Sequence, residues 1–273
     1  MTRSRKSDLI PGERLKSFSQ HWKEFQASRG IRKLVQFGYK MKFDSMPKLT
    51  QPRAVYATSL PEEQMKVVRA SVAEFVAKGA VRKLSKAEAK QKPGFYSKLF
   101  TVPKPNGTWR MIIDMRKLNS HIAKKKFKMQ GLKDVRSSLK PNMYGCVIDI
   151  SDAYYHVSIH RKSRKYTRFM LDGDVYEYLG LPMGLTCSPR IFTKISKAVA
   201  DVLRKRGIII IIYIDVSIKT SMFTCYLAVL LLGYFGPCSL LRCLCTTCKG
   251  CVGHAQASWF HHTAGKMHSY SIY

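Results

Sequence analysis

Two aspartates that directly follow apolar runs are the residues best placed for chemistry. Asp149 ends the run 147–149, and Asp215 ends the run 208–215. Short apolar runs of this kind are typical of buried strands, so two neighbouring strands would bring the carboxylates together. Close carboxylates repel each other unless cations neutralise them, and hard oxygen ligands suit Mg²⁺ or Mn²⁺.

A pair of carboxylates in this arrangement points to nucleotidyl transfer. Two divalent ions about 3.5–4 Å apart can activate an attacking 3′-hydroxyl and stabilise the leaving pyrophosphate. The alternative is that each aspartate only ends a strand and faces water. The two residues by themselves leave both interpretations open.

Helical and hairpin patterns surround these strands. Ser59 and Glu62 have capping-box spacing, and apolar residues then recur at helical spacing until Gly79, which predicts a helix between them. Runs 97–103 and 108–114 flank Asn106-Gly107, so they predict a β-hairpin. Runs 166–171 and 175–179 predict a second hairpin around Asp172-Gly173.

The remaining elements complete an α+β pattern. Ser188 and Pro189 mark the start of a helix that the basic residues 204–206 and Gly207 close, and the apolar run 208–213 follows. This order predicts an α+β sheet with helices on one face. Residues 1–57 are basic and weakly periodic, and we expect a short helix around 15–27 followed by extended chain.

Charge narrows the range of partners. The 273 residues carry 48 Lys and Arg against 17 Asp and Glu, a formal charge of +31, while 45% apolar residues exclude wholesale disorder. Such an excess favours nucleic acid as the partner, with an anionic membrane surface second. The start of the chain lacks the apolar stretch of a secretory signal, so we expect an intracellular protein, cytoplasmic or nuclear.

The last 54 residues are a different kind of sequence. Residues 220–273 contain no acid, few cations and six of the eight Cys. The spacing of Cys245, Cys248, Cys251 and His254 suggests a metal, but a zinc site normally joins two pairs across a longer loop, so we favour none. Residues 221–241 are long and uncharged enough to span a bilayer, an interpretation that internal Gly and Pro weaken. We expect instead an aberrant tail, such as a shifted reading frame.

Four ordered motifs between residues 60 and 219 resemble those of reverse transcriptases. They are 149–155 as the catalytic palm motif, Lys104 with 109–119 as the fingers segment around the triphosphate, 178–189 as the turn that contacts template and nucleotide, and 213–215 as part of the Tyr-x-Asp-Asp hairpin. Residues 79–97 most resemble retrotransposon polymerases of the DIRS or gypsy-like type. The resemblance implies fingers and palm over 58–219, after a basic extension 1–57 and before the tail.

The resemblance also implies a role for individual residues. Asp149, Asp215 and the carbonyl of Ile150 would bind Mg²⁺ or Mn²⁺. Lys104 and Arg110 would contact the triphosphate, Tyr154 would exclude a ribose 2′-hydroxyl, and Met183 with Gly184 would line the nucleotide pocket. RNA template, DNA primer and dNTP would be the partners, together with other retroelement proteins. The basic runs at 124–128 and 161–168 would follow the nucleic-acid backbone, which supplies affinity without sequence choice.

The sequence departs from the family pattern in two places. Val216 stands where the family has a second Asp, which is expected to weaken metal binding, and no primer grip or basic thumb follows residue 225. The first interpretation is an RNA-directed DNA polymerase domain with an incomplete thumb. A catalytically dead, nucleic-acid-binding relic or domesticated protein is the first alternative, and a palm polymerase that copies RNA into RNA is the second. Tyr154 argues against the latter.

Overall fold

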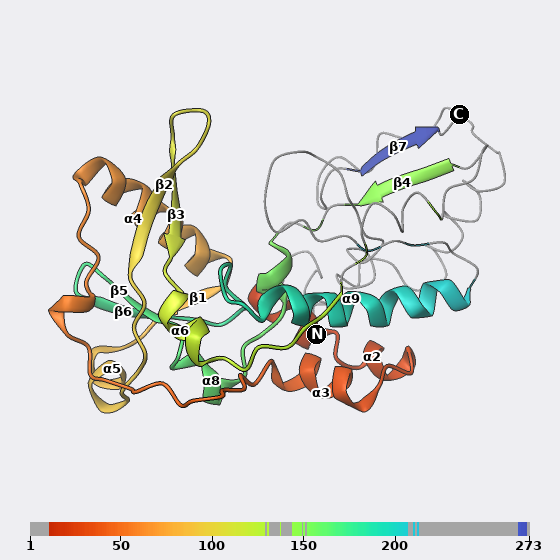
Figure 1. Ribbon diagram of the computed structural model, residues 1–273, viewed down its shortest axis with the longest axis horizontal. Coiled ribbons are helices and arrows are strands. Elements are labelled where there is room, and N and C mark those ends of the chain that lie inside the picture. Colours follow the sequence, from red (N-terminus) through yellow and green to blue (C-terminus); the bar gives the residue numbers. More distant parts are fainter. Residues whose placement is uncertain are drawn as a thin grey trace, which may run out of the picture.

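The structure, a computed structural model, describes residues 11–128, 130, 137, 144–148, 150, 152–206, 210, 212 and 267–271. Figure 1 shows the long helix α9 with α2 and α3 along it, and the hairpin β2-β3 projecting beside α4. The α-helices are α1 Pro11–Ser17, α2 His21–Glu24, α3 Arg29–Phe37, α4 Glu62–Ala77, α5 Lys86–Gln91, α6 Arg116–His121, α8 Arg161–Arg164 and α9 Ser188–Lys205. Short 3₁₀ turns are η2 Ala54–Tyr56 and η3 Ala153–His156. The strands are β1 Val81–Lys83, β2 Leu99–Pro103, β3 Trp109–Ile113, β4 Tyr144–Ile148, β5 Arg168–Leu171, β6 Asp174–Tyr178 and β7 Met267–Ser271.

The strands form three antiparallel sheets within the described residues. These are β1-β6-β5, β2-β3 and β4-β7, so the described part of the fold mixes helices and strands, as predicted, and its strands do not join into one sheet. β4, which precedes Asp149, pairs with β7 in a register that sets Val147 opposite His268. A strand near the end of the chain therefore pairs with the strand that precedes Asp149. Most of the run 208–215, the neighbour expected for β4, lies outside the described residues.

Both predicted hairpins are present. Leu99 to Pro103 pairs with Ile113 to Trp109 around a loop in which Gly107 has φ +77°. Asp172 and Gly173 both have positive φ, 50° and 78°, between β5 and β6. Positive φ at both central residues matches the twist of two-residue hairpin loops, which explains why these residue types occur there.

The two long helices form where periodicity predicts them, with one correction. α9 begins at Ser188 with Pro in its first turn, as predicted. α4 begins at Glu62, with Pro61 at the N-cap and no side-chain cap, so the capping box assigned to Ser59 is wrong. Pro61 takes an extended ψ of 147° and its carbonyl accepts from the N–H of Met65. Ser59 thus lies two residues before the N-cap, where its side chain cannot cap the first turn.

The N-terminal segment differs from the expected helix and extended chain. Three short helices, α1, α2 and α3, replace the single helix and the start of the extended chain, and a positive φ at Gln26 separates α2 from α3. Residues 38–53 contain no helix, as expected. Leu15, Trp22 and Ile31 belong to the same core cluster as the rest of the fold. Gly12 meets the end of α4 so closely that a Cβ would lie 1.9 Å from the carbonyl oxygen of Gly79. The described part of residues 1–57 therefore packs into the main body.

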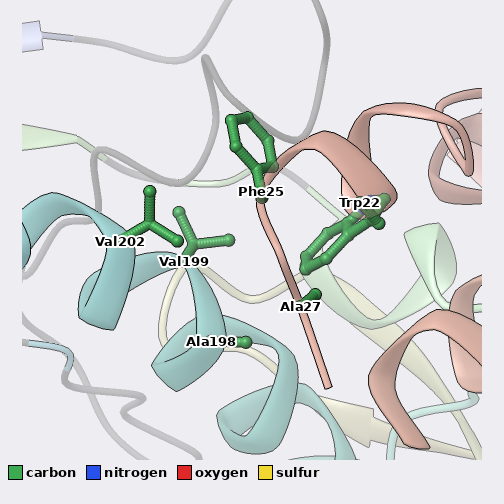
Figure 2. A pocket seen from close by; sticks show the side chains of 6 residues that line it. All are labelled: Trp22, Phe25, Ala27, Ala198, Val199 and Val202. Carbon is green, nitrogen blue, oxygen red and sulfur yellow. The ribbon is translucent and has the colours of Figure 1, made fainter. Parts of the chain in front are cut away.

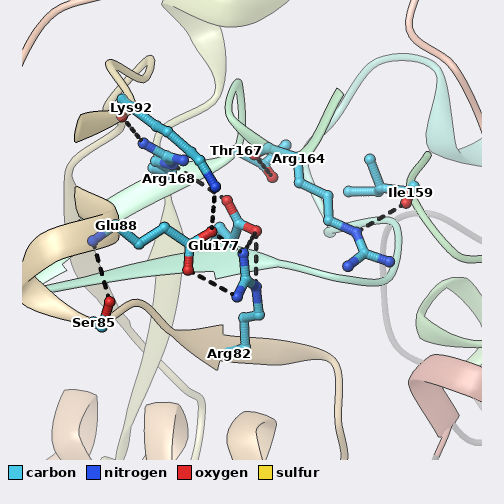
Figure 3. Close-up of polar contacts among 9 residues, drawn as sticks. All are labelled: Arg82, Ser85, Glu88, Lys92, Ile159, Arg164, Thr167, Arg168 and Glu177. Atoms are coloured by element: carbon cyan, nitrogen blue, oxygen red, sulfur yellow. Dashed lines mark hydrogen bonds and ion pairs between the residues drawn. The ribbon is translucent and has the colours of Figure 1, made fainter. Parts of the chain in front are cut away.

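A buried ion network joins β1, α5, β6 and β5 (Figure 3). Glu177, with 3% of its side chain exposed, accepts from Arg82 at 2.7 and 2.9 Å and from Arg168 at 3.2 Å. Arg82 also binds Glu88 and lowers the pKa of that carboxyl through this hydrogen bond. Arg168 donates in addition to the carbonyl of Lys92. Buried charges need partners of this kind, so the network fixes the segment that leads into β2.

Candidate functional site

The β2-β3 hairpin carries the two cations predicted to contact a triphosphate. Lys104 and Arg110 are exposed. One face of the hairpin packs on α4, since Thr101 donates to Gln64 at 2.7 Å. Arg110 alternates with the buried Met111, and it lies on the other face. Strand geometry places its Cα roughly 10 Å along β3 from that of Ile113 at the base of the hairpin.

The face of the hairpin that carries Arg110 is otherwise apolar. It presents Phe100 and Val102 from β2, and Ile112 from β3, none of them buried. Phe100 is 37% exposed. A guanidinium next to accessible apolar side chains suits a ligand that has both phosphates and flat bases.

The turn that carries Met183 and Gly184 packs against the base of this hairpin. Met183 is 60% exposed, and Gly184 has φ +84°, a conformation that L side chains rarely adopt. A Cβ at Gly184 would lie 3.7 Å from the carbonyl oxygen of Ile113. The structure thus brings the predicted pocket residues of the turn to the foot of the strand that carries Arg110.

Two side chains hold this turn. Asn119 on α6 donates from Nδ2 to the carbonyl of Gly184 at 2.8 Å and accepts from the N–H of Thr186 at 2.9 Å. Ser188, fully buried at the start of α9, donates to the carbonyl of Pro182 at 2.9 Å. Sequence reasoning placed Asn119 in a motif without a role, because nothing in the sequence shows what its side chain contacts.

Tyr154 lies on η3, which follows Asp152. Its ring meets that of Phe192 on α9 edge to face, with 5.7 Å between centroids. Burial raises the pKa of Tyr154 to about 12, so the phenol stays neutral at physiological pH. The residue is only partly buried and packs against the core cluster, as does Ile150. The position below a sugar stays a prediction.

Asp152 shows an unusual backbone that the sequence did not indicate. It has φ 57° and ψ 30°, in the left-handed region, and its carboxylate binds Lys78 at 2.9 Å. Lys78 also binds Glu74 at 2.6 Å. The end of α4 is thereby linked to the segment next to Asp149.

Asp149 and Asp215 lie outside the described residues. The described residues hold no group of three or more His, Cys, Asp or Glu side chains that could bind a metal. The predicted donors, two carboxylates and the carbonyl of Ile150, are all oxygen atoms, which fits Mg²⁺ or Mn²⁺. The Cys-rich spacing at 245–254 also lies outside the description.

The two basic runs differ in accessibility. Lys124, Lys125, Lys126 and Lys128 are all exposed, and no carboxylate of the described residues pairs with them. The segment lies along α9, because Lys197 donates to the carbonyl of Lys128 at 3.2 Å. In the second run, however, Arg168 is buried in the network with Glu177, so the prediction that it follows a nucleic-acid backbone is wrong.

An apolar hollow between α2 and α9 lies apart from these residues. Figure 2 shows its lining, in which no polar side chain takes part: Trp22, Phe25, Ala27, Ala198, Val199 and Val202. None of the predicted site residues lines it. No helix among the described residues is both long enough and apolar enough to cross a membrane.

Comparison with known proteins identifies the segment that holds these residues. Residues 102–220 match the family of reverse transcriptases (RNA-dependent DNA polymerases). The chain is 34% identical over 95 residues to the Pro-Pol polyprotein of simian foamy virus type 3 (strain LK3), which covers 35% of this chain and 8% of that protein. It is 30% identical over 111 residues to the retrovirus-related Pol polyprotein from transposon gypsy of Drosophila melanogaster, covering 40% of this chain and 10% of that protein. The chain spans about a tenth of the length of these curated relatives. The segment 102–220 therefore matches the reverse transcriptase family and is similar to retroelement Pol polyproteins.

Proposed function

We propose that the chain adds deoxynucleotides to a primer 3′-hydroxyl on an RNA template, by two-metal nucleotidyl transfer. One observation carries the proposal. The Met183-Gly184 turn packs at the base of the hairpin that carries Arg110 and Lys104, within the matched segment 102–220. In this proposal a bound nucleotide would lie between the exposed Met183 of the turn and the exposed cations of the hairpin.

The cations of the hairpin would bind the triphosphate. The planar guanidinium of Arg110 can form two parallel hydrogen bonds to phosphate oxygens, whereas Lys104 acts as a point charge. Met183 would contact the base, and Gly184 would let the backbone approach the nucleotide. Tyr154 would exclude the 2′-hydroxyl with a ring that Phe192 supports on one edge.

Asp149, Asp215 and the carbonyl of Ile150 would hold Mg²⁺ or Mn²⁺. When bound, the ions supply an activated hydroxyl and stabilise the leaving pyrophosphate. The exposed lysines of 124–128 would contact the phosphates of template or primer. Contacts to phosphate give affinity that does not depend on sequence.

Primer extension tests the proposal directly. The full chain is assayed with dNTPs or NTPs on RNA and DNA templates, with Mg²⁺ or Mn²⁺. Asp149→Asn is expected to abolish extension while nucleic-acid binding stays near the wild-type value. Tyr154→Ala is expected to admit NTPs. Extension that survives Asp149→Asn would show that Asp149 is not a metal ligand.

A nucleic-acid-binding relic without catalysis is the second candidate, and Val216 favours it. A valine in place of the family's second carboxylate cannot bind a metal ion. Restored extension in Val216→Asp would identify the missing carboxylate as the defect. Restored extension only after a family-type thumb is grafted behind residue 219 would identify primer positioning instead.

A further inference from the structure

We infer that Asn119 is a positioning residue, which fixes the Met183-Gly184 turn against the fingers hairpin and so sets the width of the nucleotide pocket. The inference rests on the proposed function for the ligand, but the contact itself is a property of the free protein. Asn119 bridges two elements that are 65 residues apart in the chain, α6 and the turn before α9.

The chemistry of the two contacts determines how the amide lies. The carbonyl of Gly184 can only accept, and the N–H of Thr186 can only donate. One side chain that offers both a donor and an acceptor in one plane satisfies them together, and an amide does so. Neither a carboxylate nor an aliphatic side chain at this position could do so.

Asn119 stands on a fixed base. Its neighbour Leu118 is fully buried and anchors α6, and the N–H of Asn119 donates to the carbonyl of Met115 at 2.7 Å. Met115 also comes within 4.0 Å of the Cβ position of Gly184. The segment that follows β3 is therefore joined to the Met183-Gly184 turn by van der Waals contact and two hydrogen bonds.

The left-handed Gly184 explains why such a clamp is needed. Glycine is the residue with the most conformational freedom to lose, so an exposed turn around it samples many backbone states. Two hydrogen bonds to the carbonyl of Gly184 and the N–H of Thr186 restrict those states. The turn is then preorganised, and nucleotide binding does not have to order it.

The first experiment needs no ligand. Hydrogen exchange in the free full chain reports the amide of Thr186, which is protected only while it donates to Asn119. Asn119→Ala should raise its exchange rate on the order of tenfold, because one net hydrogen bond is lost. Ser120→Ala is the matched control: Ser120 is the next residue on α6 and is exposed, and among the described residues its hydroxyl donates only to the carbonyl of Lys117. An unchanged exchange rate in Asn119→Ala would overturn the inference.

The second experiment measures dNTP affinity, and the KM and kcat of extension. Asn119→Ala should raise the dNTP Kd and KM on the order of 10-fold, with kcat and template-primer affinity little changed. Asn119→Asp keeps the acceptor but sets a carboxylate oxygen against the carbonyl of Gly184. Its defect should shrink as pH falls, because the protonated carboxyl can donate again, whereas that of Asn119→Ala should not.

The outcomes separate the two proposals. An unchanged dNTP Kd in Asn119→Ala, when the wild-type chain binds dNTP, would overturn the positioning role. A wild-type chain that binds no dNTP would overturn the proposed function and the nucleotide part of this inference, while the exchange data would still report the clamp.

Discussion

Glu177→Gln should be among the most destabilising single substitutions in the described part of the chain. Both Glu177 and Arg168 expose only 3% of their side chains, so the substitution leaves the guanidinium of Arg168 buried without its carboxylate. Removing one partner of a buried pair typically costs about 3–5 kcal/mol. For a domain of this size that corresponds to a fall in melting temperature of roughly 6–20 °C.

Thermal unfolding followed by circular dichroism measures this effect. Glu62→Gln is the control, since Glu62 pairs with Arg69 at the surface with 67% of its side chain exposed, and its melting temperature should stay at the wild-type value. Glu177→Leu combined with Arg168→Met should recover much of the loss, because an apolar pair leaves no buried charge. A Glu177→Gln protein within about 1 kcal/mol of the wild type would refute the reasoning, since the pair would then contribute no more than a surface one.

Three further outcomes are expected. Nucleic-acid affinity should fall steeply as the salt concentration rises. Replacement of all three lysines at 124–126 by Ala should reduce the slope of log binding constant against log salt concentration by about 2 for single-stranded nucleic acid. An affinity that is equal at low and high salt would contradict this. Gly184→Ala should cost about 1–2 kcal/mol in a denaturant titration, because its φ of +84° is unfavourable for alanine although the added Cβ would make only ordinary van der Waals contacts. The melting temperature should decline below about pH 5, because Arg82 and Arg116 lower the folded-state pKa values of Glu88 and Asp114. The stability that these carboxylates add above their ordinary pKa is lost as the pH falls through the folded-state values. A melting temperature that stays constant down to pH 3 would exclude this linkage.

The sequence by itself determined the elements that local rules control. Gly107 and the Asp172-Gly173 pair mark both hairpins because few other residues accept positive φ at a turn. Pro189 and the apolar spacing that follows it mark α9 in the same way. The order of the motifs, together with Arg110 and the Met183-Gly184 turn, was also sufficient to indicate the reverse transcriptase domain, since each motif is a short local pattern.

Tertiary structure decided which distant residues meet. Arg168 looks like one more cation in a basic run, and only the pairing of β5 with β6 brings it to Glu177 and away from solvent. The role of Asn119 depends on a turn 65 residues later, and the partner of β4 is a strand from the last seven residues. These contacts form between segments that are far apart in the sequence. A local sequence pattern does not show which of their surfaces become buried against each other. A charged side chain can be assigned to the surface only once its burial is known. A buried cation needs a partner because its removal from water costs free energy.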